Sequence, residues 1–145
     1  MLAALCLPLS GCGLLHDEPE PTSAQAYAAL EQVNSHLLQA VAEPGSVTKG
    51  VKGRPIPCGG LGGNQWNKVK VDHSVSGMAT HPATVLEAIR VVLEIRGIET
   101  SGPDLTPVGQ QLAFSGAGYR TGFSVREDGS IVASGSTDCL DNPER

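Results

Sequence analysis

The side chains best suited to chemistry in this chain are its four cysteines and four histidines. Cys58 and Cys139 would form a disulfide in an oxidising compartment, whereas in a reducing one they would stay thiols or would ligate a metal together with His73 and His81. No Cys-x-x-Cys or His-x-x-x-His spacing supports a metal site. We therefore expect a disulfide between Cys58 and Cys139, with no metal and no cofactor.

Cys12 closes an apolar run that begins at Met1, and small residues stand directly before it. Leu9-Ser10-Gly11-Cys12 resembles the lipobox of bacterial lipoproteins, in which the cysteine thiol receives a diacylglycerol before the peptidase cuts in front of it. The resemblance implies that Cys12 becomes an acylated N-terminus that anchors the protein on the extracytoplasmic face of the cell membrane. The alternative is an apolar N-terminal strand or helix that contains Cys12.

Three regions follow from the lipoprotein interpretation. Residues 1–11 are the signal peptide, residues 12–22 the lipidated cysteine and its tether, and residues 23–145 a single domain. The tether is predicted because residues 16–22 are acidic, contain two prolines and lack large apolar side chains. No Lys or Arg lies between Met1 and Cys12, so we expect the signal to begin at a start codon further upstream.

Motifs for catalysis are weak in this chain. Gly-x-Ser-x-Gly is absent, and the glycines at 59–63 are not followed by Gly-Lys-Ser or Gly-Lys-Thr, so they indicate a flexible loop rather than a phosphate site. His73 falls on the apolar side of a predicted strand, and His81 precedes Pro82 at the start of a predicted helix. We expect both histidines to be structural and the protein not to be an enzyme; an envelope enzyme that uses His73 or His81 is the less favoured alternative.

Helical spacing of apolar residues predicts two helices that position these side chains. The first is expected from Ser23, acting as N-cap, to about Ala42. The second is expected from Thr80 or His81 to Gly97, which suits a C-terminal cap.

Period-two alternation predicts the strands. One strand is expected from Trp66 to about Val75, and further strands at 110–117, 119–125 and 131–136. Asp128-Gly129 predicts a two-residue hairpin turn that places Val125 opposite Val132. The glycine-rich residues 46–64 are predicted to be loop.

This order of elements predicts an α+β fold of the order α-β-α-β-β-β, in which an antiparallel sheet of three to four strands carries both helices on one face. The other face would be open. Such a mixed-charge face is most simply solvated surface, but it is also the candidate interaction surface, formed by Trp66, Lys68, Lys70, Arg120 and Arg126.

Composition limits the partners. The net charge of −5 and the pI of about 5.2 argue against nucleic acid, and an aromatic content of 3% argues against an aromatic-lined sugar groove. No stretch after Cys12 approaches the roughly 20 apolar residues of a membrane-spanning helix. The membrane would therefore be reached through lipid at Cys12 alone.

The chain also resembles the small exported lipoproteins of actinobacteria. The resemblance is carried by the lipobox, by Gly118-Tyr119-Arg120 through Asp128-Gly129, and by Ser136-Thr137-Asp138-Cys139. It implies a cell-envelope location and a non-enzymatic role, and it assigns no catalytic residue. We expect a lipid-anchored binding or interaction module with an envelope protein as partner; the alternative is a carrier of a small apolar ligand or lipid in a cavity between helices and sheet.

Overall fold

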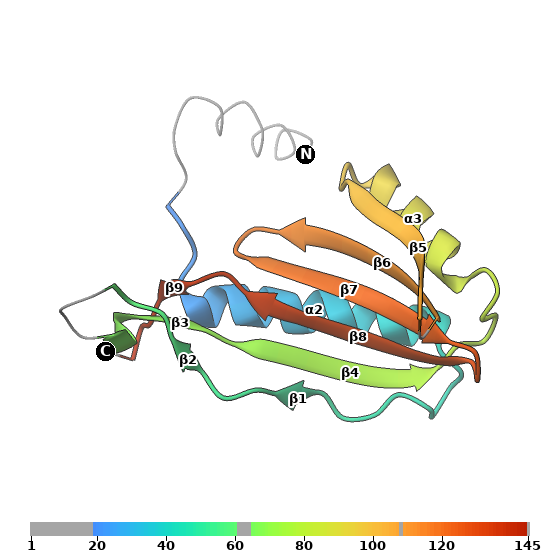
Figure 1. Ribbon diagram of the computed structural model, residues 1–145, viewed down its shortest axis with the longest axis horizontal. Helices are drawn as coiled ribbons and strands as arrows, with labels where there is room; N and C mark the ends of the chain where they lie inside the picture. The colour runs from blue at the N-terminus through green and yellow to red at the C-terminus, as the bar shows by residue number, and fades with distance from the viewer. Residues whose placement is uncertain (1–18, 61–64, 108, 145) are drawn as a thin grey trace, which may run out of the picture.

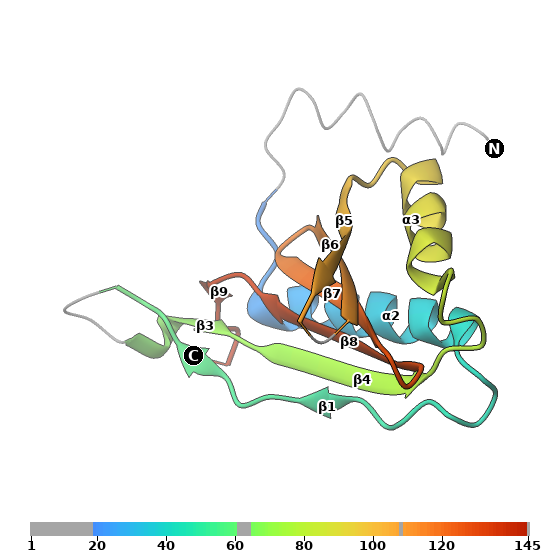
Figure 2. The ribbon, with the colours of Figure 1, turned by 45° about the vertical axis from the view of Figure 1, so that its right-hand side comes forward.

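The computed structural model describes residues 19–60, 65–107 and 109–144. In these residues a six-stranded antiparallel sheet carries two helices, α2 (Ser23–Val41) and α3 (Val85–Ile95), and a three-stranded antiparallel sheet extends from one end of the larger one (Figure 1). The larger sheet is strongly curled, and the axes of α2 and α3 run in clearly different directions (Figure 2).

The order of the larger sheet is β1-β4-β8-β7-β6-β5, so β8 and β7 lie at its centre. In that order the strands are β1 (Val51–Lys52), β4 (Asp72–Met78), β8 (Ser130–Thr137), β7 (Tyr119–Arg126), β6 (Gly109–Gly116) and β5 (Thr100–Thr106). The smaller sheet has the order β2-β3-β9, with β2 (Ile56–Pro57), β3 (Lys68–Lys70) and β9 (Leu140–Asp141), and the short 3₁₀ helix η1 (Gln65–Asn67) precedes β3.

The predicted sheet of three to four strands in the order α-β-α-β-β-β is wrong. The described residues form nine strands in two antiparallel sheets, which makes a β-rich α+β fold. Three of the additional strands, β1, β2 and β9, are only two residues long. Two residues are too short to show any alternation, so these strands exist only because a longer partner strand lies beside them.

The strand predicted from Trp66 to Val75 is divided at Val71. Residues before Val71 pair with β2 and β9, and residues after it pair with β1 and β8. The predicted alternation itself is confirmed, since Val69, His73 and Val75 are all buried. Alternation has the same period on both sides of the division, so it cannot reveal where a chain passes from one sheet to another.

β5 runs through Gly102-Pro103, a pair of residues that is typical of turns. The strand pairs with β6 in two segments, and its register shifts between Ser101 and Asp104. β5 is an edge strand, and an edge with a bulge accommodates a proline that has no backbone N–H to contribute.

The cap of α2 lies one residue earlier than predicted. Thr22, not Ser23, is the N-cap: its hydroxyl accepts a hydrogen bond from the Gln25 backbone N–H, and the Gln25 side chain accepts one from the Thr22 backbone N–H. This reciprocal pair is a capping box. Ser23 is instead buried as the first helical residue.

The β7–β8 hairpin also differs from its prediction in register. Val125 pairs with Ile131, not with Val132, because residues 127–129 connect the two strands. The Gly129 N–H donates to the Arg126 carbonyl, and Gly129 has a φ of 90°. This glycine is one residue more than a two-residue turn contains, so the pairing shifts by one residue. Val125 and Ile131 consequently both face the core.

The main core lies between the helices and one face of the larger sheet. Leu38 of α2, Ile89 and Leu93 of α3, and Leu112, Phe123 and Ile131 of the sheet are at most 1% exposed. A second, smaller core of Tyr27, Val69 and Val71 joins α2 to the smaller sheet. Both helices therefore cover one face of the larger sheet, and neither helix covers the other face.

Candidate functional site

The uncovered face of the larger sheet is hollowed into a trough of about 640 Å³. The trough crosses β1, β4, β8, β7 and β6, so it spans most of the sheet. Short side chains form much of its surface, contributed by Ser74, Ser134, Ser136, Gly122, Ser124 and Ala113. Asp72, Gln111 and Arg120 add longer polar groups.

The trough is a direct consequence of alternation along the strands. On β7, Thr121, Phe123 and Val125 are buried against the helices, so Gly122 and Ser124 between them face the other way. β8 repeats this pattern with Ile131 and Ala133 inside. Because the outward positions near the middle of neighbouring strands are small, with Gly122 and Ser124 on β7 and Ser134 on β8, the face is recessed there rather than flat.

The predicted interaction surface is divided by the fold. Arg120 lines the trough, but Arg126, at the other end of β7, does not. Lys68 and Lys70 are exposed on β3 of the smaller sheet, and Trp66 lies in η1 beside them. The sequence missed Gln111 and Ser134 as trough residues, since only strand pairing brings β6 and β8 beside β7.

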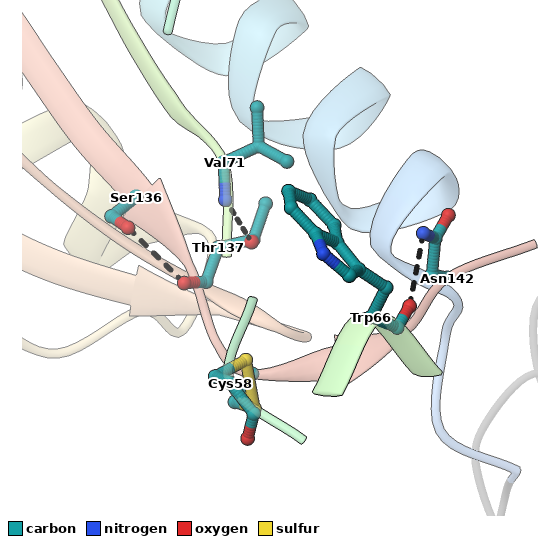
Figure 3. Close-up of a disulfide and its surroundings, with 7 residues drawn as sticks. Cys58, Trp66, Val71, Ser136, Thr137 and Asn142 are labelled. Atoms are coloured by element: carbon teal, nitrogen blue, oxygen red, sulfur yellow. Dashed lines mark hydrogen bonds between the residues drawn. A yellow bond between two sulfur atoms is a disulfide. The ribbon is translucent and has the colours of Figure 1, made fainter. Parts of the chain in front are cut away.

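The disulfide between Cys58 and Cys139 is confirmed, with 6.0 Å between the two Cα atoms (Figure 3). Cys58 directly follows β2 and Cys139 directly precedes β9, the two outer strands of the smaller sheet. The bond therefore holds these strands on either side of β3. It also commits both sulfur atoms, so the alternative metal site with His73 and His81 is not formed.

Trp66 borders the disulfide region. Its indole points toward Val71 and Thr137, and its carbonyl accepts a hydrogen bond from the Asn142 side-chain amide at 3.1 Å (Figure 3). The residue is 43% exposed. Trp66 is thus partly a cover over the smaller core and partly an accessible aromatic surface.

His73 belongs to a buried polar cluster that sequence reasoning did not assemble. The Thr121 hydroxyl donates to Asn34 Oδ1 at 2.7 Å, and Asn34 Nδ2 lies 3.0 Å from His73 Nδ1. Asn34, His73 and Thr121 are all buried. Because Oδ1 accepts from Thr121, the amide nitrogen donates to Nδ1, which places the ring proton of neutral His73 on Nε2. A signal for Asn34 was present, since it stands four residues after Leu30 within the apolar stripe of α2.

The Nε2 atom of His73 lies against the backbone at Gly50, just before the edge strand β1. A Cβ atom at position 50 would be only 2.7 Å from Nε2, so a glycine is required there. Nε2 has no hydrogen-bond partner among the described residues. The Tyr27 ring packs edge-on against His73, and Lys52 Nζ lies 4.8 Å from the centre of that ring.

Burial lowers the pKa of His73 below its ordinary value of 6.5, although the carboxylate of Glu31 acts in the opposite direction. The unfolded chain then binds a proton at a higher pH than the folded one does. The free energy of unfolding contributed by this group is therefore complete above pH 6.5 and is lost as the pH falls below it.

We expect urea titrations to show a larger loss of stability between pH 7.5 and pH 5.0 in the wild type than in His73→Gln. Glutamine retains an acceptor for Asn34 and removes the titrating ring. His81→Gln, which alters an exposed histidine, is the matched control and should follow the wild-type pH dependence. Parallel curves for the wild type and His73→Gln would contradict the assignment.

His73 and His81 are not brought together. His73 is near the start of β4 and His81 follows its end, and the five residue steps from His73 to Met78 already cover about 16 Å of extended strand. His81 lies exposed in the turn that precedes α3. This geometry offers no common acid–base site for the two histidines.

The described residues hold neither a cluster of metal-ligating side chains nor a membrane-spanning helix. Across 19–60, 65–107 and 109–144, no group of three or more His, Cys, Asp or Glu side chains is arranged to hold a metal ion. Within the same residues neither helix is long and apolar enough to cross a membrane. Cys12, the signal peptide and most of the tether lie outside the described residues, so their interpretation stays a prediction.

Comparison with protein-family models, with curated proteins and with solved structures finds no match for this chain. The function proposed below therefore rests on the residues and geometry of the chain itself.

Proposed function

We propose that this protein is a non-catalytic binding module, anchored by lipid at Cys12 to the extracytoplasmic face of the cell membrane, that presents the trough of its larger sheet to a protein partner in the envelope. The trough is the observation that carries this proposal. It combines a recessed shape with hydroxyl, amide and guanidinium groups that remain available for hydrogen bonds.

The shape of the trough favours an extended polar segment as its occupant. Small side chains let another backbone approach the sheet closely, and the serine hydroxyls both donate and accept hydrogen bonds. Arg120 at the rim suits a carboxylate of the partner, because a guanidinium binds a carboxylate through two parallel hydrogen bonds.

Two further features support export. A disulfide is typical of proteins that fold in an oxidising compartment. The tether from Cys12 to the N-cap Thr22 can span up to about 36 Å when extended, which is enough to let the domain turn its trough toward a partner above the membrane.

Site-specific crosslinking in cells that export the protein tests the trough. A photoreactive phenylalanine analogue at Ser124 should give a discrete crosslinked species, and Arg120→Glu should reduce its yield about tenfold because one charge-assisted contact becomes repulsive. The measurement is the ratio of crosslinked to free protein after irradiation.

Arg126→Glu is the matched control. It makes the same charge reversal on the same strand outside the trough, so the crosslinked yield should not change. Equal effects of the two reversals, or no crosslinked species from any trough position, would remove the trough as the binding surface.

The anchor is tested separately by the intact mass of protein extracted from membranes. We expect a chain that begins at Cys12 and carries acyl groups. A mass that retains residues 1–11 would refute the anchor while leaving the crosslinking result to stand or fall by itself.

A further inference from the structure

A second hollow lies between the two helices, on the side of the larger sheet opposite the trough. It has a volume of about 620 Å³, within the usual range of small-ligand sites. Its walls are mostly apolar and come from Val33 and Ala40 of α2 and from Ala88 and Val92 of α3, and Tyr119 of β7 also lines it. We call this hollow the interhelical groove.

The groove exists because the helices rest on different parts of a curled sheet. α2 lies over β4, β8 and β7, whereas α3 lies against β5, β6 and β7. Their axes run in clearly different directions, so the helices cannot pack along their lengths (Figure 2). Alanines at positions 40 and 88 leave the space between them unfilled.

Arg96 is the one residue with a formal charge among those that line the groove, since none of the lining residues is an aspartate, a glutamate or a lysine. This bias is notable because the chain as a whole has 15 acidic residues against 10 lysines and arginines. Arg90, six residues before Arg96, is paired with Glu87 and Glu94, whereas Arg96 makes no ion pair with any described residue.

We infer that the interhelical groove binds a free long-chain fatty acid, with the acyl chain between α2 and α3 and the carboxylate at Arg96. The apolar walls match a hydrocarbon chain, and the single available cation at the rim matches one terminal anion. The acyl groups expected on Cys12 are esters or amides without a free carboxylate, so the charge of the groove favours a separate ligand over the anchor of the protein itself.

The binding test uses the full chain with Cys12→Ala, produced under oxidising conditions so that no attached acyl group competes. The probe is cis-parinaric acid, a fluorescent fatty acid, with palmitate and its methyl ester as competitors. We expect saturable binding, displacement by palmitate, and displacement by the uncharged ester that is about tenfold weaker because it lacks the contact with Arg96.

Two variants locate the ligand. Ala88→Trp fills the groove and should abolish saturable binding, whereas Ala28→Trp, the same change at an exposed alanine outside the groove, should leave it unchanged. Arg96→Gln should weaken palmitate about tenfold and leave the methyl ester unaffected, so that the two competitors become equivalent. Circular dichroism spectra establish that each variant is folded.

Three outcomes would overturn the inference. They are no saturable binding by the wild type, equal loss in Ala88→Trp and Ala28→Trp, and a methyl ester that competes as well as palmitate against the wild type. The inference does not depend on the proposed function, because Arg120→Glu in the trough and Ala88→Trp in the groove lie on opposite faces of the sheet and report on the two sites separately.

Discussion

Replacing Cys58 and Cys139 together by serine is expected to lower the free energy of unfolding by about 4.5 kcal/mol, the chain-entropy value for closing a loop of this length. The two cysteines are 81 residues apart, so the unfolded chain gains a large number of conformations when the bond is lost. The value is an upper figure, because unfolded chains with residual structure gain less. For a domain of this size the loss corresponds to a decrease of about 15 °C in Tm.

The fluorescence of the single tryptophan shows which part of the fold loses stability when the disulfide is removed. Trp66 lies in η1, beside the strands that the disulfide connects, so its fluorescence reports on the smaller sheet, whereas circular dichroism reports on the whole fold. In the double serine variant we expect the fluorescence transition to come at lower urea than the dichroism transition, since β2 and β9 are two-residue strands that lose their covalent link. The wild type under reducing conditions is the control and should behave like the variant. Stability within 1 kcal/mol of the oxidised wild type would show that the bond is not a structural constraint.

Asn34→Leu is expected to lower the free energy of unfolding by about 2 kcal/mol, even though position 34 stands within the apolar stripe of α2. The substitution leaves the buried His73 Nδ1 without its donor, and the buried Thr121 hydroxyl keeps only its longer bond to the Ser134 carbonyl, at 3.2 Å. A buried polar group without a partner costs about 1–3 kcal/mol, so the unpaired Nδ1 accounts for most of the effect. Urea denaturation at pH 7.5 measures it.

Gln39→Leu provides the matched control for this prediction. It makes the same kind of change, from amide to leucine, at an exposed position of α2, and we expect an effect within about 0.5 kcal/mol of the wild type. The double variant Asn34→Leu/Thr121→Val should lose less than the sum of the two single variants, because each single variant already breaks the hydrogen bond between Asn34 and Thr121. Additive losses would mean that the two side chains do not act as one network.

Much of the local structure was predictable from the residues. The helix from the start of α2 to Val41 and the alternation of buried residues along β4 and β7 depend on contacts a few residues apart, and their periods are visible in the sequence. The disulfide was predictable for a different reason: once Cys6 and Cys12 are assigned to the leader and the anchor, only Cys58 and Cys139 are left to pair. The trough was only partly predictable, because the open face of β7 was recognised but not the strands beside it.

What the sequence determined by itself was the set of faces: which side of each helix and each longer strand is apolar, and which cysteines pair. The tertiary structure alone decided how those faces meet. It divided one alternating segment at Val71 between two sheets, and it brought Asn34, His73 and Thr121 into one buried cluster. It also set α2 and α3 apart, so that a groove with Arg96 at its rim lies between them. The physical reason is that a period is a local property of a few consecutive side chains, whereas the choice of a partner strand or helix is decided by the packing of the whole chain.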